Sequence, residues 1–107
     1  MSDILIVDDE RDIRELISDI LEDEGFTTRL AGNSDDAMKE VHEKRPGLLI
    51  LDIWLKDSKM DGIDILKAVK TDYPEVPVVI ISGHGNIEIA VAAIRQGAYD
   101  FIEKPFN

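Results

Sequence analysis

Residues 4–10 read Ile-Leu-Ile-Val-Asp-Asp-Glu, four aliphatic residues followed directly by three acids. Similar aliphatic runs occur at 48–51 and 78–81, and a weaker one at 99–102. Continuous apolar runs of this length are typical of strands covered on both faces, as in a parallel sheet. A fifth segment, residues 26–30, alternates partly between apolar and polar side chains. It predicts an edge strand.

Segments with a helical period lie between these strands, because apolar residues recur there every three or four positions. The first helix is expected to stop at Gly25, the second to begin with Ser34 as its cap, and the fourth to stop at Gly97. Strict alternation of strands and helices predicts a doubly wound α/β domain with five parallel strands. The apolar stripes are Ile13, Leu16, Ile17, Ile20 and Leu21; Ala37, Met38 and Val41; Ile63, Ile65, Leu66 and Val69; and Ile87, Ala90, Val91 and Ile94.

Length and composition limit the possible functions. A chain of 107 residues has the size of one domain. It contains no cysteine, which excludes disulfides, Cys-ligated zinc and iron–sulfur clusters. Its net charge of −11 opposes binding to nucleic acid phosphates and to anionic membranes. No signal peptide or membrane-spanning run is recognisable, so we expect a cytoplasmic protein.

The chain stops at Asn107, soon after the fifth strand. A doubly wound domain of five strands normally closes with a fifth helix, which this sequence lacks. We therefore expect a domain truncated before its last helix; the alternative is that another chain covers that face. Apolar surface beside the fifth strand would then favour a homodimer or a swapped oligomer.

Polar residues follow the strands at the edge where parallel α/β sheets bind ligands. Asp52 follows the third strand, Ser82 ends the fourth, and Lys104 follows the fifth. Asp8 and Asp9 follow the first. Clustered carboxylates favour a hard divalent cation, Mg²⁺ above all. A carboxylate beside such a cation and a lysine can attack phosphorus and hold an acyl phosphate.

Each of these residues also has a simpler interpretation. Asp8 and Asp9 would serve as helix caps, Ser82 as a turn residue, and Lys104 as a solvated surface residue. Asp52 is harder to explain in this way, because an aspartate after four apolar strand residues needs a partner. Their joint placement at one edge favours a site.

At these residues the sequence resembles the receiver domain of two-component response regulators, over residues 4–106. The resemblance rests on the acidic run at 7–10, on Leu51-Asp52, on Ser82-Gly83, and on Lys104-Pro105-Phe106. Residues 52–55 and 82–106 resemble NtrC-type regulators most closely, and among them the NtrX group. The resemblance implies a flavodoxin-like sheet of order 2-1-3-4-5.

The resemblance also implies a role for each matching residue. Asp52 would accept phosphate from a sensor histidine kinase. Asp9 and Asp52 would bind Mg²⁺ directly, with the backbone carbonyl of Trp54, and Asp8 would bind it through water. The domain would then switch a transcription-regulating output without itself binding nucleic acid.

Further matching positions concern the phosphoryl group and the switch. Ser82 would turn toward the phosphate, Lys104 would bind a phosphoryl oxygen, and Phe101 would follow as the switch aromatic, where tyrosine is common. The Lys104–Pro105 peptide would be cis. Glu10, Gly83, His84 and Pro105 would form the rim of the site. Trp54 could belong to the rim or to the core.

One departure from the family pattern lies after the acceptor. The Asp61-Gly62 pair comes two positions later than is usual, and the loop before it has no proline. We expect this loop to be long and mobile, with consequences for metal affinity and phosphate lifetime.

Two other functions remain open on the residues alone. A Mg²⁺-dependent phosphohydrolase of similar topology would carry Asp-x-Asp after the first strand, where this chain has Asp8-Asp9-Glu10. A binding-only module would be expected to lack one of the site residues. The sequence thus favours a domain that phosphorylates and slowly dephosphorylates its own aspartate, rather than an enzyme acting on other substrates.

Overall fold

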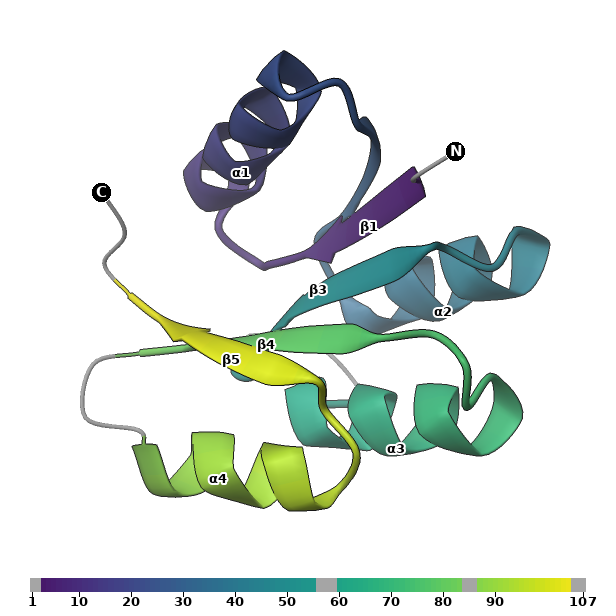
Figure 1. The fold of residues 1–107 in the computed structure, drawn as a ribbon, viewed down its shortest axis with the longest axis vertical. Coiled ribbons are helices and arrows are strands. Elements are labelled where there is room, and N and C mark those ends of the chain that lie inside the picture. The colour runs from purple at the N-terminus through teal and green to yellow at the C-terminus, as the bar shows by residue number, and fades with distance from the viewer. Residues whose placement is uncertain (1–2, 56–59, 84–86, 105–107) are drawn as a thin grey trace.

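Strands and helices alternate along the whole chain in the computed structural model, which describes residues 3–55, 60–83 and 87–104 (Figure 1). The strands are β1 (Asp3–Val7), β2 (Thr27–Ala31), β3 (Leu48–Asp52), β4 (Val78–Ser82) and β5 (Asp100–Glu103). The helices are α1 (Arg11–Asp23), α2 (Ser34–Glu43), α3 (Gly62–Asp72) and α4 (Ile87–Arg95).

All five strands form one parallel sheet in the order β2-β1-β3-β4-β5. The prediction of a doubly wound, flavodoxin-like sheet is confirmed, including β2 as an edge strand. The apolar runs of β1, β3 and β4 are largely buried because helices lie on both faces of the sheet, whereas Tyr99 and Ile102 of the weaker fourth run are exposed. Among the described residues, no helix combines the length and apolar character needed to cross a bilayer.

The two faces of the sheet carry different cores. Side chains from α2, α3 and α4 pack on one face, around Leu5, Leu49 and Ile80. On the other face, Ile17 and Leu21 of α1 pack over a smaller cluster. That cluster consists of Ile4, Ile6, Ile50 and Ile81. The larger core therefore lies on the side of α2, α3 and α4.

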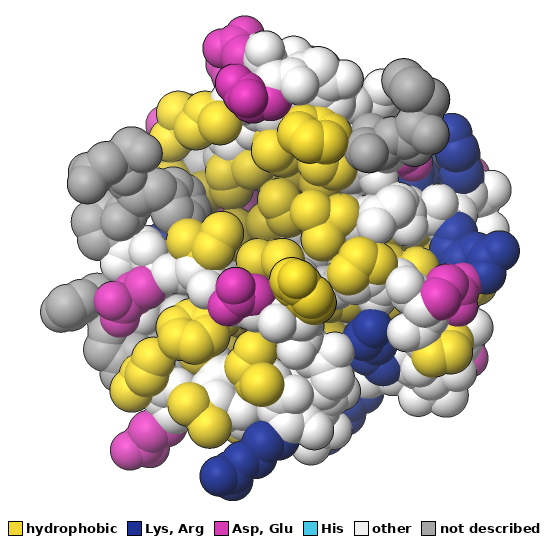
Figure 2. Space-filling model, viewed as in Figure 1, with side chains coloured by type: hydrophobic (Ala, Val, Ile, Leu, Met, Phe, Trp, Pro, Cys, Tyr) yellow, Lys and Arg dark blue, Asp and Glu magenta, His cyan; other side chains and the backbone are white. Residues whose placement is uncertain are grey.

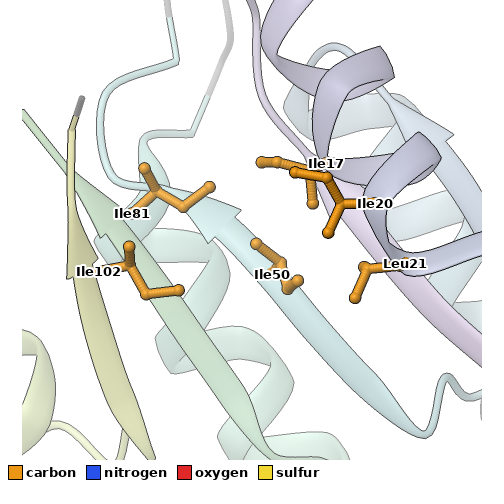
Figure 3. Close-up of a pocket in the computed structure, with 6 residues that line it drawn as sticks. All are labelled: Ile17, Ile20, Leu21, Ile50, Ile81 and Ile102. Atoms are coloured by element: carbon orange, nitrogen blue, oxygen red, sulfur yellow. The ribbon is translucent and has the colours of Figure 1, made fainter. Parts of the chain in front are cut away.

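An apolar groove of about 240 Å³ opens beside α1 (Figure 3). Ile20 on α1 and Ile102 on β5 stand at its borders, 48% and 45% exposed. Hydrophobic side chains accordingly gather across the middle of this face, between α1 and α4 (Figure 2). The expected apolar surface beside β5 is thus present. The groove is lined by Ile17, Ile20, Leu21, Ile50, Ile81 and Ile102.

Two helix starts differ from the sequence prediction or add to it. Asn33, not Ser34, caps α2, because its side chain accepts a hydrogen bond from the Asp36 amide at 2.8 Å. Ser34 is instead buried in the first turn of α2, where its hydroxyl accepts from the Met60 amide at 3.3 Å. At α3, Asp61 and Asp64 form a reciprocal capping box. Together these contacts hold residues 60–64 at the start of α3.

Of the stripe predicted for α4, only Ala90 lies on the buried side of the helix. Ile87, Val91 and Ile94 are 39–49% exposed, whereas Ala90 and Ala93 are buried. Small side chains let α4 lie close to the sheet; Ile89 packs against the larger core, whereas Ile87, Val91 and Ile94 are exposed. The glycines expected to end α1 and α4 both adopt positive φ, 94° at Gly25 and 107° at Gly97.

Candidate functional site

The ends of four neighbouring strands bring the predicted site residues together. Asp52 is the last residue of β3 and Ser82 the last of β4. The Lys104 amide donates to the Ser82 carbonyl at 2.8 Å, which fixes the start of the Lys104 side chain. Asp8 directly follows β1, and its amide donates to the Ala31 carbonyl at 3.2 Å. Parallel strand register thus assembles the site from residues far apart in sequence.

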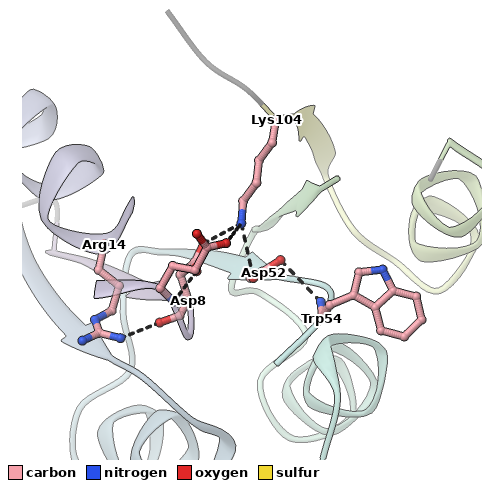
Figure 4. A network of polar contacts seen from close by, with 6 residues as sticks. Asp8, Arg14, Asp52, Trp54 and Lys104 are labelled. Carbon is pink, nitrogen blue, oxygen red and sulfur yellow. Dashed lines mark hydrogen bonds and ion pairs between the residues drawn. The ribbon is translucent and has the colours of Figure 1, made fainter. Parts of the chain in front are cut away.

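Lys104 lies at the centre of the acidic side chains (Figure 4). Its Nζ is 3.4 Å from Asp8 Oδ2, 3.6 Å from Asp52 Oδ2 and 3.1 Å from Glu10 Oε1. The Asp8 and Asp52 side chains are buried, at 0% and 5% exposure, whereas Glu10 is exposed. Two buried carboxylates therefore share one ammonium group. The simpler interpretation of Lys104 as a solvated surface residue is wrong.

Burial and crowding of like charges perturb the titration of these groups. Burial, followed by the charge of Asp8, raises the pKa of Asp52 to about 7, although Lys104 opposes this rise. Burial also raises the pKa of Asp8. For Lys104, burial lowers the pKa, but the carboxylates of Asp52, Asp8 and Glu10 outweigh it and leave the pKa raised. A cation bound here would favour the ionised forms of Asp8 and Asp52 over their protonated forms.

The donor set fits a hard divalent cation. Oxygen atoms from the carboxylates of Asp8, Asp9 and Glu10 lie within 4.8 Å of one another. The Asp8 Oδ1 atom accepts a hydrogen bond from the Glu10 amide at 2.8 Å. Its other oxygen, Oδ2, is buried, and its one described partner is the Lys104 ammonium, in an ion pair at 3.4 Å rather than a well-formed hydrogen bond. A buried oxygen left in this way suits Mg²⁺, which binds carboxylates and keeps several waters.

Asp8 does not have the helix-capping role considered as an alternative. The residue at the cap position of α1 is Glu10, whose side chain makes no capping hydrogen bond. The side chain of Asp8 binds only one backbone amide among the described contacts, and its second oxygen faces Lys104. Its burial and orientation match a role in the site.

Ser82 presents a buried hydroxyl at the same edge. Its side chain is 1% exposed, and Oγ has no hydrogen-bond partner among the described residues. Alternation along β4 places Ser82 on the same face as Ile80, and Phe101 is the β5 residue paired with Ile80. Phe101 is partly buried and packs against the larger core. Ser82 and Phe101 therefore occupy the same side of the sheet.

Trp54 belongs to the rim. Its side chain is 52% exposed, and its backbone amide lies 3.4 Å from Asp52 Oδ1. Gly83 follows β4 and is half-buried. The rim positions His84 and Pro105 lie outside the described residues, as do the Lys104–Pro105 peptide and residues 56–59 of the loop after the acceptor.

Sequence reasoning missed one polar contact of the site. Arg14, in the second turn of α1, donates from Nη1 to the backbone carbonyl of Asp8 at 2.7 Å. The sequence indicated this contact only by placing an arginine about one helical turn after Asp8-Asp9-Glu10. The sequence showed the Asp61-Gly62 pair but not the reason for its glycine: a Cβ at residue 62 would lie 2.4 Å from the Asp52 carbonyl oxygen. The predicted Asp-Gly pair is thus needed for close backbone approach.

Comparisons with known proteins agree with this geometry. Residues 4–107 match the family model of the response regulator receiver domain. The nitrogen assimilation regulatory protein NtrX of Azorhizobium caulinodans is 62% identical over 98% of this chain. The DNA-binding transcriptional regulator NtrC of Proteus hauseri is 36% identical over 97%. This chain spans only 23% and 22% of the lengths of these two relatives.

A solved structure is equally similar. The crystal structure of the receiver domain of NtrX from Brucella abortus superposes with a TM-score of 0.95 at 58% identity. The match covers 97% of this chain and 87% of that one. The similarity therefore extends over the whole sheet and the edge where the acidic residues meet.

Proposed function

Because the chain belongs to the response regulator receiver domain family and is of the NtrX and NtrC type, we propose that Asp52 is its phosphoacceptor. The observation that carries the proposal is the position of Asp52: a buried carboxylate at the end of β3, 3.6 Å from an ammonium and next to a second buried carboxylate. A partner sensor histidine kinase would supply the phosphoryl group, which implies a cytoplasmic location. Residues 1–107 would form this receiver domain.

The reaction is a direct transfer to oxygen. A carboxylate oxygen of Asp52 attacks phosphorus, and a P–O bond forms as the P–N bond of the kinase phosphohistidine breaks. The imidazole leaves and takes up a proton. Since the product is an acyl phosphate on the chain itself, the domain performs self-phosphotransfer and slow self-dephosphorylation, not turnover of outside substrates.

Asp9, Asp52 and the Trp54 carbonyl would hold Mg²⁺ directly, and Asp8 would hold it through water. The bound cation would offset negative charge on the phosphoryl oxygens. Lys104 would exchange its present carboxylate partners for a phosphoryl oxygen, and the rim of Glu10, Gly83, His84 and Pro105 would border the group. The position of Lys104 supports this exchange, because its ammonium already lies within 3.6 Å of both Asp8 and the proposed acceptor Asp52.

Phosphorylation would then shift the population between two packings. The Ser82 hydroxyl, which has no described partner, would bond the phosphoryl group, and Phe101 would move toward the space it leaves. The surface that changes would be α4 and β5, where Ile87, Val91 and Ile94 are already exposed. In a longer protein this surface would control a transcription-regulating output. The net charge of −11 argues that the domain does not bind nucleic acid itself.

We also propose that the apolar groove is covered by a second copy of the chain, as a homodimer or a swapped oligomer. All six lining residues are isoleucine or leucine, and two of them are nearly half exposed. Apolar surface gathered in this way favours association.

Intact mass after incubation with acetyl phosphate tests the acceptor. We expect a Mg²⁺-dependent gain of one phosphoryl group in the wild type and none in Asp52→Asn. Asp72→Asn, at the exposed end of α3, is the matched control and should label normally. Labelling that persists in Asp52→Asn would place the acceptor elsewhere. Steady hydrolysis of a small phosphate ester would instead support the phosphohydrolase alternative.

A further inference from the structure

We propose that Arg14 is a positioning residue for the cation site, acting through the backbone carbonyl of Asp8. The inference rests on the proposed function, because it concerns the Mg²⁺ that the acidic residues would hold. Arg14 itself has no described contact with a carboxylate of the site. Its contribution would be to fix the backbone from which Asp8 and Asp9 project.

Three hydrogen bonds hold Asp8 in place, and the Arg14 guanidinium donates one of them. Arg14 Nη1 donates to the Asp8 carbonyl at 2.7 Å (Figure 4). The Asp8 amide donates to the Ala31 carbonyl, and Asp8 Oδ1 accepts from the Glu10 amide. Together these bonds engage the amide, the carbonyl and the carboxylate of a single residue. The direction of the remaining oxygen, Oδ2, is thereby determined.

The opposite wall of this contact is Gly32, which follows β2. A Cβ at Gly32 would lie 2.7 Å from Arg14 Nη1 and 3.3 Å from Cζ. A side chain at residue 32 would therefore require the guanidinium to shift from its present position. Helix α1, through Arg14, and the turn after β2, through Gly32, thus meet at the hydrogen bond to the Asp8 carbonyl.

Charge and position predict opposite effects of removing Arg14. A cation near the site repels Mg²⁺, so loss of its charge alone would strengthen metal binding. Loss of the hydrogen bond would free the Asp8 backbone and weaken binding, as when groups that orient metal ligands are removed. The sign of the change in the Mg²⁺ dissociation constant therefore separates the two effects.

A Mg²⁺ titration provides the test, with the fluorescence of Trp54 as its readout. Trp54 is the only tryptophan, and its amide lies beside the Asp52 carboxylate. We expect Arg14→Ala to raise the dissociation constant about tenfold. Gly32→Ala should act in the same direction by displacing the guanidinium, and Arg14→Lys should recover part of the affinity. With saturating Mg²⁺, labelling by acetyl phosphate should return to nearly the wild-type rate.

The matched control is Arg11→Ala, which removes the same charge from the same helix. Arg11 is exposed and pairs with Glu15 at 2.7 Å, and no described hydrogen bond or ion pair joins it to Asp8. Its loss should leave Mg²⁺ binding unchanged or slightly tighter. If Arg14→Ala binds Mg²⁺ as tightly as Arg11→Ala, the positioning role is refuted.

The two proposals fail in different ways. A wild type that neither binds Mg²⁺ nor accepts a phosphoryl group would overturn the proposed function and this inference with it. A wild type that does both, with unchanged Mg²⁺ binding in the Arg14 variants, would overturn the inference alone. If Arg14→Ala does not fold by circular dichroism, Gly32→Ala and Arg14→Lys decide: wild-type Mg²⁺ affinity in both would also refute it.

Discussion

Asp52 Oδ2 lies 3.6 Å from Lys104 Nζ, and Asp8 Oδ2 lies on the same ammonium at 3.4 Å. The single ammonium of Lys104 is therefore the shared ion-pair partner of two buried carboxylates. Burial, and after it the charge of Asp8, raises the pKa of Asp52 to about 7 even with a lysine beside it. This rise also makes the site a source of instability whose size depends on pH and on cations.

The first prediction concerns pH. A carboxyl of the unfolded chain titrates near pH 3.9, whereas Asp52 in the folded chain has a pKa of about 7. Between these values the folded state binds more protons, so this group lowers the free energy of unfolding as pH rises from about 4 to 7. Asp52→Asn should therefore be more stable than wild type by about 1–3 kcal/mol at pH 8 and little changed at pH 4.

Urea unfolding at the two pH values measures this difference, with Asp72→Asn as control. A gain of equal size at pH 4 and pH 8 would show that ionisation of Asp52 is not its origin.

The second prediction concerns Lys104. Replacing it by alanine leaves Asp8 and Asp52 without their counter-charge, which should lower the free energy of unfolding by about 2–3 kcal/mol at pH 8 in chelator. The same variant should bind Mg²⁺ more tightly, because no internal cation competes for the carboxylates. Added Mg²⁺ should therefore restore more stability to the variant than to the wild type.

Thermal melts with chelator and with Mg²⁺ give both quantities. Lys67→Ala, on the exposed side of α3, is the control. Weaker Mg²⁺ binding in Lys104→Ala than in wild type would contradict the idea of competition.

The third prediction concerns Ser82. Its buried hydroxyl has no described hydrogen-bond partner, so Ser82→Ala removes an unsatisfied polar group and should raise the free energy of unfolding by about 1 kcal/mol or leave it unchanged. The proposed response to phosphorylation should nevertheless be lost, because no hydroxyl remains to bond the phosphoryl group. Denaturant unfolding and NMR shifts of the Phe101 ring on phosphorylation measure the two effects. A clear loss of stability would mean that the hydroxyl is bonded in the folded protein.

The fourth prediction concerns association. Light scattering should show a species larger than a monomer, and Ile102→Ser should reduce it by shrinking the apolar lining of the groove. Val91→Ser is a matched control, since Val91 has similar exposure, 43% against 45%, but lies on α4 on the other side of the sheet. A monomer at high concentration would refute self-association. Equal effects of the two variants would move the interface away from the groove.

The sheet, and the meeting of Asp8, Asp52 and Lys104 at one edge, were predictable because apolar runs indicate strands and parallel register brings strand ends together. Asp52 and Ser82 needed no further information, since each ends a strand. The exposed face of α4 was not predictable in this way. Ile87, Val91 and Ile94 form as good a stripe as the buried alanines, and only packing against the sheet selects between them.

The role of Arg14 was hidden for a different reason. Its contact is with a backbone carbonyl, and every residue has one, so no residue type in the sequence marks the partner. The guanidinium also lies against Gly32, which is distant in sequence and follows β2, the strand paired with β1. The cap of α2 is a smaller example, because Asn33 and Ser34 are both good caps and local geometry chose the first.

Lys104 directly follows β5, an edge strand, yet its ammonium reaches past β4 to residues at the ends of β3 and β1. The rim of the sheet is therefore mechanically tied to its centre by one side chain. We expect a molecule that tilts β5 to move that charge as well. The lifetime of the proposed acyl phosphate would then change when a partner binds at β5, and measuring that lifetime would report the binding.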